Sequence, residues 1–440
     1  MTKEELKQKV CQAIEARKEQ VLALGESIYS EPELGFKETK TAAKVENLFR
    51  ALGIPYEKEL ALTGVKGRLK GKNSQRTIAV LGELDAVICA AHQAADPLTG
   101  AAHCCGHNTQ IAMLMAVGMG LIDADAMEYL AGDVILFAVP AEEYVEITYR
   151  NKLREEGKLK YIGGKQELIH LGAFDDIDMA LQIHLLPSSG TDSFVKLGST
   201  SNGFIGKLVH YQGKAAHAAM APAEGVNALN AAMLGVMGVH AQRETFREQD
   251  VVRFHPIITH GGDLVNVIPD DVRLESYVRA ASIEALTGSN QKIDRALRAG
   301  ADAVGATVTI NDLPGYLPMK NNRELNQIFR GNAEALFGAS QVVEGAHEAG
   351  STDTGDLSHI MPVIHPWLGC VSGALHSKDY TVADTEAAYI KSAQALAMTV
   401  IDLLYGQGET AETILADYTP LLTKEQYLEF LNSFATNHMV

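Results

Sequence analysis

Acidic side chains and an imidazole lie at the ends of three short apolar runs, and these residue types could bind a metal and activate water. The run TIAVLGEL contains Glu83 and is followed at once by Asp85. The run VILFAV is followed by the pair Glu142–Glu143, and the run MALQIHLL carries His184 near its end. In open α/β sheets, ligands and catalytic groups collect beyond the carboxyl ends of the strands. We therefore expect these side chains to meet at one edge of a sheet.

The segment HCCGHN adds a thiol and an imidazole between the first two of these runs. In an extended segment, residues two apart project to the same side, so Cys105 and His107 can share one ion. Thiolate, imidazole and carboxylate ligands together suit a divalent metal such as zinc, manganese or cobalt. The alternative is that these side chains are buried structural groups, with a disulfide between the adjacent Cys104 and Cys105.

The adjacent carboxylates Glu142 and Glu143 come where the chain leaves a predicted buried strand. On a solvated surface such a pair commonly has no function, but burying it is costly without a metal or another partner. Consecutive side chains diverge, so one carboxylate can bind a metal while its neighbour acts as a base. A metal hydrolase needs both a Lewis acid that acidifies a water and a base that takes its proton.

Short apolar strands alternate with helices along much of the chain, and these elements must position the reactive groups. The strands predicted at 77–84, 134–139 and 179–186 are nearly continuous apolar runs, and a helical segment at 109–122 separates the first two. Such strands indicate a mostly parallel sheet covered on both faces.

The pattern changes between about residues 200 and 313, where the predicted order is strand, helix, strand, strand, helix, strand. This order is the ferredoxin-like arrangement, which forms a compact domain by itself. The sequence therefore predicts an α/β catalytic domain made of residues 1–200 and 314–440. An inserted ferredoxin-like α+β (βαββαβ) domain for dimerisation or as a lid occupies residues 201–313.

Composition and charge exclude several classes of function. The 440 residues are 46% apolar and 21% charged, and the formal net charge of −17 argues against a general nucleic-acid binder. The longest strongly apolar run, 111–122, is shorter than the roughly 20 residues that span a bilayer. The start MTKEELKQKV has no apolar stretch of the secretory kind, and five cysteines do not indicate a disulfide scaffold. We expect a cytoplasmic enzyme with no nucleic-acid or membrane partner.

Seven motifs carry a resemblance to a known family: PELGFKE, ELDAV, HCCGHN, PAEE, HAAMAP, NVIPD and STDTGD, in this order. Together they resemble the amidohydrolase branch of metallopeptidase family twenty, which includes aminoacylases, hippurate hydrolases and hydrolases of auxin–amino-acid conjugates. HCCGHN and STDTGDLSH are most similar to the subgroup of p-aminobenzoyl-glutamate hydrolase and the β-alanyl-lysine dipeptidases. The resemblance covers roughly residues 29–405.

The resemblance implies two divalent metal ions per subunit, manganese, zinc or cobalt. Cys105 would bridge the ions, and Glu142 would be the general base that passes a proton to the leaving amine. Asp85 would orient a ligand such as His107. The implied metal ligands are Cys105, His107 and His184 for one ion, and Cys105, Glu143 and His376 for the other.

Three residues of the inserted domain also match the family's pattern. The resemblance implies that His217 reaches into the partner subunit's site of a homodimer and stabilises the tetrahedral oxyanion. It also implies that Asn266 and Arg279 hold the substrate's carboxylate, for which an arginine fork is well suited. The alternatives are a histidine and an asparagine that only stabilise turns, and an arginine that is only solvated.

Two departures from the family pattern stand out. Many relatives have glycines directly after the paired glutamates, whereas this chain has the charged segment Tyr144–Gly164, from which we expect a helix or lid near the site. Cys104 replaces a common alanine and adds a thiol that oxidation could reach.

The motifs together predict a metal-dependent amidohydrolase that cleaves the amide bond of N-acyl or aminoacyl amino acids. Its small-molecule substrates would be p-aminobenzoyl-glutamate-like conjugates or small dipeptides. Two alternatives remain open at this point. One is a catalytically inactive relative that binds a metal or ligand, and the other is a protein with a single structural zinc.

Overall fold

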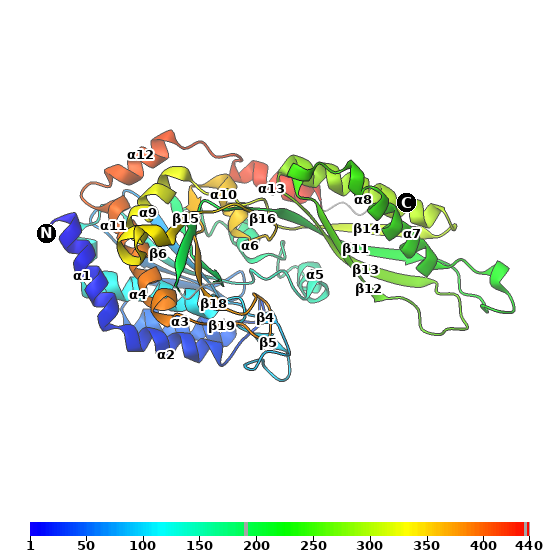
Figure 1. The fold of residues 1–440 in the computed structure, drawn as a ribbon, viewed down its shortest axis with the longest axis horizontal. Coiled ribbons are helices and arrows are strands. Elements are labelled where there is room, and N and C mark those ends of the chain that lie inside the picture. The colour runs from blue at the N-terminus through cyan, green and yellow to red at the C-terminus, as the bar shows by residue number, and fades with distance from the viewer. Residues whose placement is uncertain (189–191, 435–437, 440) are drawn as a thin grey trace. The chain divides into compact units, whose positions relative to one another are not determined.

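The chain forms two compact units in the computed structural model, which describes residues 1–188, 192–434 and 438–439 (Figure 1). The first unit comprises residues 1–200, 320–346 and 356–421, and the second comprises residues 201–319, 347–355 and 422–440.

The structure assigns the C-terminal helix and the short segment 347–355 to the second unit, whereas the sequence predicts them in the catalytic domain. The sequence pattern places all residues after 313 in the catalytic domain, whereas the second unit includes 314–319, 347–355 and 422–440. The reason is packing: Phe434, just after the last helix, lies against the apolar core of the second unit, and residues 438–439 pair with its last strand.

A six-stranded sheet forms the centre of the first unit, in the order β1-β2-β6-β3-β7-β17. The strands β6, β3, β7 and β17 are parallel to one another, and every residue of β3 and β6 is buried, as the apolar runs predict. The antiparallel hairpin β1–β2 at one edge is an addition that the sequence pattern did not reveal. The bounds are β1 Tyr56–Leu60, β2 Gly64–Leu69, β3 Thr77–Glu83, β6 Asp133–Val139, β7 Met179–Leu181 and β17 Val363–Ile364.

Helix α4 is the central helix of the first unit and packs against β3 and β6. Its sequence is apolar nearly all round, so all but its last two residues are buried, and other helices surround it. The helix Glu386–Leu404 is long and apolar enough to span a membrane, but 89% of that window is buried in the protein, as in a core helix. The bounds are α1 Lys3–Ala16, α2 Lys18–Tyr29, α3 Thr39–Ala51, α4 His107–Asp123, α9 Arg323–Phe337 and α11 Ser392–Leu404.

A second sheet in the first unit divides one predicted strand and one further apolar run of the sequence. The run MALQIHLL is not one strand, because β7 ends at Leu181 and β8 begins at His184 in the other sheet, beside β18. The run MPVIHPWLGCV divides in the same way into β17 and β18, with Pro366, which has no N–H to continue a ladder, at the break. The bounds are β8 His184–Pro187, β9 Phe194–Leu197, β15 Val342–Glu344, β18 Trp367–Ser372 and β19 Thr381–Val382.

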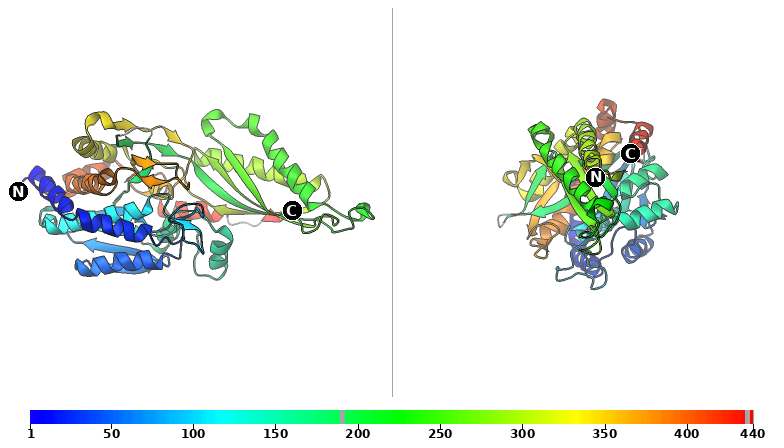
Figure 2. Two further views of the ribbon diagram at one scale, coloured as in Figure 1. Left: turned by 60° about the horizontal axis from the view of Figure 1, so that its bottom comes forward. Right: turned by 90° about the vertical axis from the view of Figure 1, so that its right-hand side faces the viewer.

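The second unit has the predicted ferredoxin-like order of elements. Its antiparallel sheet runs β12-β13-β11-β14, with β20 added beside β14, and helices α7 and α8 lie on one face (Figures 1 and 2). The fold is therefore α/β with an α+β unit, as the sequence predicts. The bounds are β11 Gly203–Gln212, α7 Ala228–Ala241, β12 Arg253–His260, β13 Asp271–Ala280, α8 Ile283–Asp302, β14 Thr307–Pro314 and β20 His438–Met439.

The charged segment after the paired glutamates folds into a helix, as expected, and a second helix follows it. These are α5 Ile147–Glu155 and α6 Gly164–Leu171. The C-terminal region is helical, with α12 Glu409–Asp417 and α13 Lys424–Ser433.

Candidate metal centre

Five possible metal ligands from separate segments of the first unit come together beyond the strand ends. Cys105 and His107 stand at the start of α4, Glu143 follows β6, His184 begins β8, and His376 lies in the loop after β18. Their ligand atoms form two groups of three, and within each group all atoms lie within 4.8 Å of one another. The groups are Cys105, His107 and His184, and Cys105, Glu143 and His376. Because Cys105 belongs to both groups, its thiolate could be shared by two ions.

The distances around Cys105 show how closely the ligands approach. The Cys105 Sγ lies 3.3 Å from the His184 Nε2 and 3.2 Å from the His376 Nε2. The His376 Nε2 is 2.9 Å from the Glu143 Oε1. His107 is fully buried, whereas the side chain of His376 is 46% exposed, so solvent reaches the cluster from the side of His376.

Hydrogen bonds orient two of the histidines so that Nε2 faces the cluster. The Nδ1 of His107 donates to the backbone carbonyl of Asp85 at 2.8 Å, and the Nδ1 of His184 donates to the carbonyl of Leu185 at 2.7 Å. The Asp85 carboxylate accepts the backbone N–H of Glu143 at 2.9 Å. Asp85 thus links ligands of both groups, the kind of outer contact that orients metal ligands.

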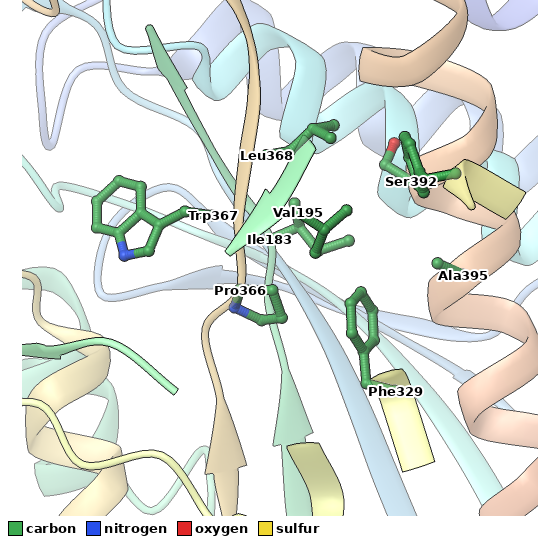
Figure 3. Close-up of a pocket in the computed structure, with 9 residues that line it drawn as sticks. Ile183, Val195, Phe329, Pro366, Trp367, Leu368, Ser392 and Ala395 are labelled. Carbon is green, nitrogen blue, oxygen red and sulfur yellow. The ribbon is translucent and has the colours of Figure 1, made fainter. Parts of the chain in front are cut away.

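The strand β18 supports His184 from behind. The Trp367 ring meets the His184 ring edge-on, with centroids 4.8 Å apart. On the other side of this strand pair lies an apolar pocket, where Ile183, Val195 and Phe329 point toward one another while Trp367 extends away (Figure 3). This pocket is part of the packing beneath the ligand strand, and no acid or imidazole lines it.

The electrostatics of the cluster favour a thiolate and a carboxylate. Burial and the nearby Glu143 raise the pKa of Cys105, but His184 and His107 outweigh both and bring this pKa down to about 6. Burial raises the pKa of Glu143, yet His376 lowers it to about 2. Burial lowers the pKa of His376, while Glu143 and Cys105 raise it to about 11. Binding a cation here therefore means replacing the His376 proton, so metal affinity depends on pH.

The turn that carries the paired glutamates is held from several sides. Ala141 has a left-handed backbone with φ of 55°, which is strained for a residue other than glycine. Its N–H donates to the Glu38 Oε1 at 2.8 Å. Glu142 is buried, and its carboxylate lies within 4.8 Å of ligand atoms of His107 and Glu83. Glu142 therefore stands beside the metal ligands without belonging to the two groups that share Cys105.

Lys165 is a site residue that sequence reasoning missed, and Glu83, which the sequence places at the strand ends, has a partner there that was not expected. The Glu83 Oε2 is 3.1 Å from the His107 Nε2, and its Oε1 is 2.8 Å from the Lys165 Nζ, with both side chains fully buried. Burial raises the pKa of Glu83, but Lys165 and His107 bring it far below its usual range. Glu83 ends a buried strand and so had a signal, whereas nothing in the segment GGKQEL marked Lys165.

The donor set fits divalent metal ions. The buried His107 Nε2 and Glu143 Oε1 lie against other ionisable groups of the cluster, the Glu83 Oε2 at 3.1 Å and the His376 Nε2 at 2.9 Å. Each is a Lewis base pointing into a cluster of thiolate, imidazole and carboxylate groups, which is the mixed set that borderline metals prefer. The carboxylate and the solvent access at His376 are typical of an open catalytic site rather than a closed structural zinc site.

Cys104 is buried and has no role in either ligand group. All five cysteines lie in described regions and are free, so the structure has no Cys104–Cys105 disulfide. Burial, followed by the neighbouring Cys89, raises the pKa of Cys104 far above its usual range. Burial and the raised pKa both favour a protonated thiol, and the oxidation that the sequence suggests stays a prediction.

Three residues of the second unit are predicted to contact the substrate, and the structure brings two of them, His217 and Asn266, close together. His217 and Asn266 are exposed on adjacent loops, where His217 pairs with Val267 and the Ala218 N–H donates to the Asn266 carbonyl at 2.9 Å. Arg279 lies near the far end of β13, where it donates to the Ser351 hydroxyl at 2.9 Å.

The length of β13 separates Arg279 from the other two residues. The eight steps from Asp271 to Arg279 span roughly 27 Å at about 3.4 Å per residue. Asn266 precedes this strand, on the side of Asp271. One substrate carboxylate can therefore contact both Asn266 and Arg279 only if the two residues come from different copies of the chain.

The fold and the ligand cluster define a metal-dependent hydrolase scaffold of the peptidase type. The family model of Peptidase family M20/M25/M40 matches residues 79–402, so the chain belongs to this family. It is a hydrolase that acts on peptide or amide bonds. The family assignment confirms the resemblance that the seven motifs indicate.

Two relatives align over most of the chain. The Xaa-Arg dipeptidase of Mus musculus is 30% identical over 448 residues, which covers 96% of this chain and 94% of the relative. An IAA-amino acid hydrolase of Arabidopsis thaliana is 27% identical over 356 residues, covering 78% of this chain and 75% of the relative.

Two solved structures show the same fold. The aminobenzoyl-glutamate utilization protein of Klebsiella pneumoniae matches with a TM-score of 0.68 and 18% identity, covering 91% of this chain and 100% of that chain. The YXEP protein of Bacillus subtilis, a dinuclear metal-binding peptidase of the M20 family, matches with a TM-score of 0.66 and 21% identity. That match covers 89% of this chain and 99% of the solved one.

Proposed function

We propose that the protein is a two-metal dipeptidase that cleaves the amide bond of small aminoacyl or acyl amino acids. The observation that carries this proposal is the pair of three-ligand groups that share Cys105, with the carboxylate of Glu142 beside them. A dinuclear peptidase with the same fold and a dipeptidase that aligns over almost the whole chain support it. The complete ligand set argues against an inactive relative, since a decaying site loses ligands.

The metals, when bound, would polarise the scissile carbonyl and increase the acidity of water in the site. Cys105, His107 and His184 would hold one ion, and Cys105, Glu143 and His376 the other. Zinc, manganese and cobalt all suit this mixture of thiolate, imidazole and carboxylate ligands.

The chain's own residues would move the proton and stabilise the charge of the transition state. Glu142 is buried beside the ligands, so its carboxylate would take the proton of the attacking water and deliver it to the leaving amine nitrogen. Asp85 would keep His107 and Glu143 in position through the two hydrogen bonds described above. His217 would donate to the oxyanion that develops on the carbonyl oxygen.

The substrates that we favour are dipeptides with a basic C-terminal residue. The named relative is an Xaa-Arg dipeptidase, and a protein of net charge −17 attracts a cationic substrate more than an anionic one. Steady-state assays with each of the three metals would compare Xaa-Arg and Xaa-Lys dipeptides with indole-acetyl amino acids and p-aminobenzoyl-glutamate. Higher kcat/KM for the basic dipeptides supports this proposal. No turnover with any metal and any substrate would support the inactive alternative.

We also propose that two copies of the chain associate through the second unit. Strand β12 is the open edge of its sheet among the described strands, and its Ile257 is 61% exposed. Helix α7 packs on the adjacent β13 and exposes Met233 and Met237 at 55% and 66%. An open edge beside exposed apolar side chains is a surface that a second copy can cover by pairing β12 with β12.

Mixing two inactive variants tests whether His217 serves the partner's site. His217→Ala should lower kcat by about 10²-fold or more, as expected for loss of an oxyanion donor. In a heterodimer of His217→Ala with Glu142→Gln, one of the two sites would contain both wild-type residues. Random exchange of equal amounts makes about half of the dimers heterodimers, so the mixture should regain roughly a quarter of wild-type activity. If both residues serve the same subunit, every site stays defective and the mixture remains inactive.

A further inference from the structure

The segment that replaces the family's glycines contributes the largest fully buried side chain of the first unit. Arg150 lies on α5, in the charged segment 144–164, and is 0% exposed. A buried guanidinium is costly unless its donors are satisfied. Its surroundings therefore indicate what it does in this unit.

The Arg150 guanidinium donates to backbone carbonyls around the turn that carries the paired glutamates. Its Nη1 donates to the Ala141 carbonyl at 3.3 Å and to the Ile162 carbonyl at 3.0 Å. Its Nη2 donates to the carbonyl of Glu143. Since Glu142 lies between the two carbonyls of the turn, the guanidinium spans the residue proposed as the base.

The segment PELGFKE provides the other wall of the Arg150 site. The guanidinium carbon lies 5.1 Å from the centroid of the Phe36 ring. A Cβ on Gly35 would approach the Arg150 Nη2 to 2.2 Å, so only glycine leaves room for the guanidinium. The Lys37 ammonium binds both carboxylate oxygens of Glu146, at 2.7 and 2.8 Å, and so ties the same segment to the start of α5.

We infer that Arg150 is a positioning residue that holds the strained turn from Ala141 to Glu143 and thereby aims the carboxylates of Glu142 and Glu143. The inference rests on the proposed function for the roles of those two carboxylates. The turn needs such support because Ala141 has a positive φ and no glycine follows the pair. In this chain the buried Arg150 of α5 stabilises the turn through hydrogen bonds to its carbonyl oxygens.

The test uses the full-length Arg150→Ala variant, with added guanidinium ion at a non-denaturing concentration as a replacement for the missing group. Hydrogen exchange of peptides covering 139–146 should become at least about tenfold faster, and guanidinium should slow it again. In the metal-loaded protein kcat should fall by about 10²-fold with KM within threefold, because a small misplacement of a catalytic group has effects of that size. Added guanidinium should raise the kcat of the Arg150→Ala variant at least about tenfold.

Arg154→Ala is the matched control, because this arginine lies one helical turn further along α5 and is only partly buried. Neither its exchange over 139–146 nor its kcat should change by more than about threefold. Gly35→Ala would press on the turn directly as well as on the guanidinium, because its Cβ would meet the Ala141 Cα and Cβ at 3.0 Å, so exchange over 139–146 should rise at least as much as in Arg150→Ala.

Two results would overturn the inference. In the first, Arg150→Ala leaves exchange over 139–146 and kcat unchanged. In the second, exchange rises throughout the first unit, the melting temperature falls, and guanidinium restores nothing, which would make Arg150 a general stabilising residue. If Arg150→Ala does not fold, Arg150→Lys decides in its place, because a lysine cannot reach both carbonyls at once.

The exchange measurement separates this inference from the proposed function. It is made on metal-free protein and requires no substrate. If the wild-type protein hydrolyses none of the amides tested, the proposed function fails, while exchange and its reversal by guanidinium still show whether Arg150 holds the turn.

Discussion

Glu142→Gln should leave a protein that binds its metals but turns over at least about 10²-fold more slowly, because glutamine cannot accept the proton of the attacking water. The side chain keeps its size, and Glu142 is outside the two ligand groups that share Cys105. We therefore expect two ions per chain and a KM within about threefold of wild type, with the loss in kcat. Metal analysis and steady-state kinetics on the same preparation measure both quantities.

Glu143→Gln is the control for this prediction, since the neighbouring glutamate is placed as a ligand and not as the base. Its amide should weaken the ion held with Cys105 and His376, so its metal content should fall together with its activity. If Glu142→Gln keeps more than a third of wild-type kcat, or if it loses metal as Glu143→Gln does, the division of roles between the two carboxylates is wrong.

Cys105→Ala should have the largest effect on metal binding, because it removes the one ligand that both groups share. Changes in residues that only orient ligands cost about 10–100-fold in metal affinity, and loss of a shared ligand should cost at least about 10²-fold for each ion. The variant should therefore hold less than one ion per chain after dialysis and show no measurable turnover. Competition with a chromophoric chelator measures the two affinities.

Cys104→Ala supplies the comparison, because it removes the adjacent thiol, which is buried and belongs to neither ligand group. It should keep both ions and most of the activity. Equal metal loss in the two variants would show that the effect comes from disturbing the loop before α4 rather than from losing a ligand.

The parts of the fold that could be predicted from the sequence are those that an apolar pattern or a characteristic order of elements identifies. The buried strands β3 and β6 are nearly continuous apolar runs, and the six elements of the ferredoxin-like unit follow one another in chain order, with only short 3-10 helices between them. The strand carrying His184 was harder, because MALQIHLL is apolar throughout while its hydrogen bonds change sheets between Leu181 and His184. Such a change of partner leaves no mark in hydrophobicity.

The residues of the site also divide into those that the sequence pattern marks and those that it does not. The thiol of Cys105 and the carboxylates after β3 and β6 could be found from the sequence, because strand ends and residue types point to them. His376 could be found only through the family resemblance, because it lies on a loop, where no periodicity of the sequence marks it. Its own backbone has a positive φ of 57°. Lys165 and Arg150 could not be predicted, because a buried cation looks like any other charge in a charged segment until its partners are known.

The most direct test of the two-ion centre is anomalous X-ray scattering from crystals of the protein loaded with zinc or manganese. The account predicts two ion peaks per chain, both bonded to the Cys105 Sγ, one with His107 and His184 and the other with Glu143 and His376. A single peak, or two peaks of which neither touches Cys105, would contradict it.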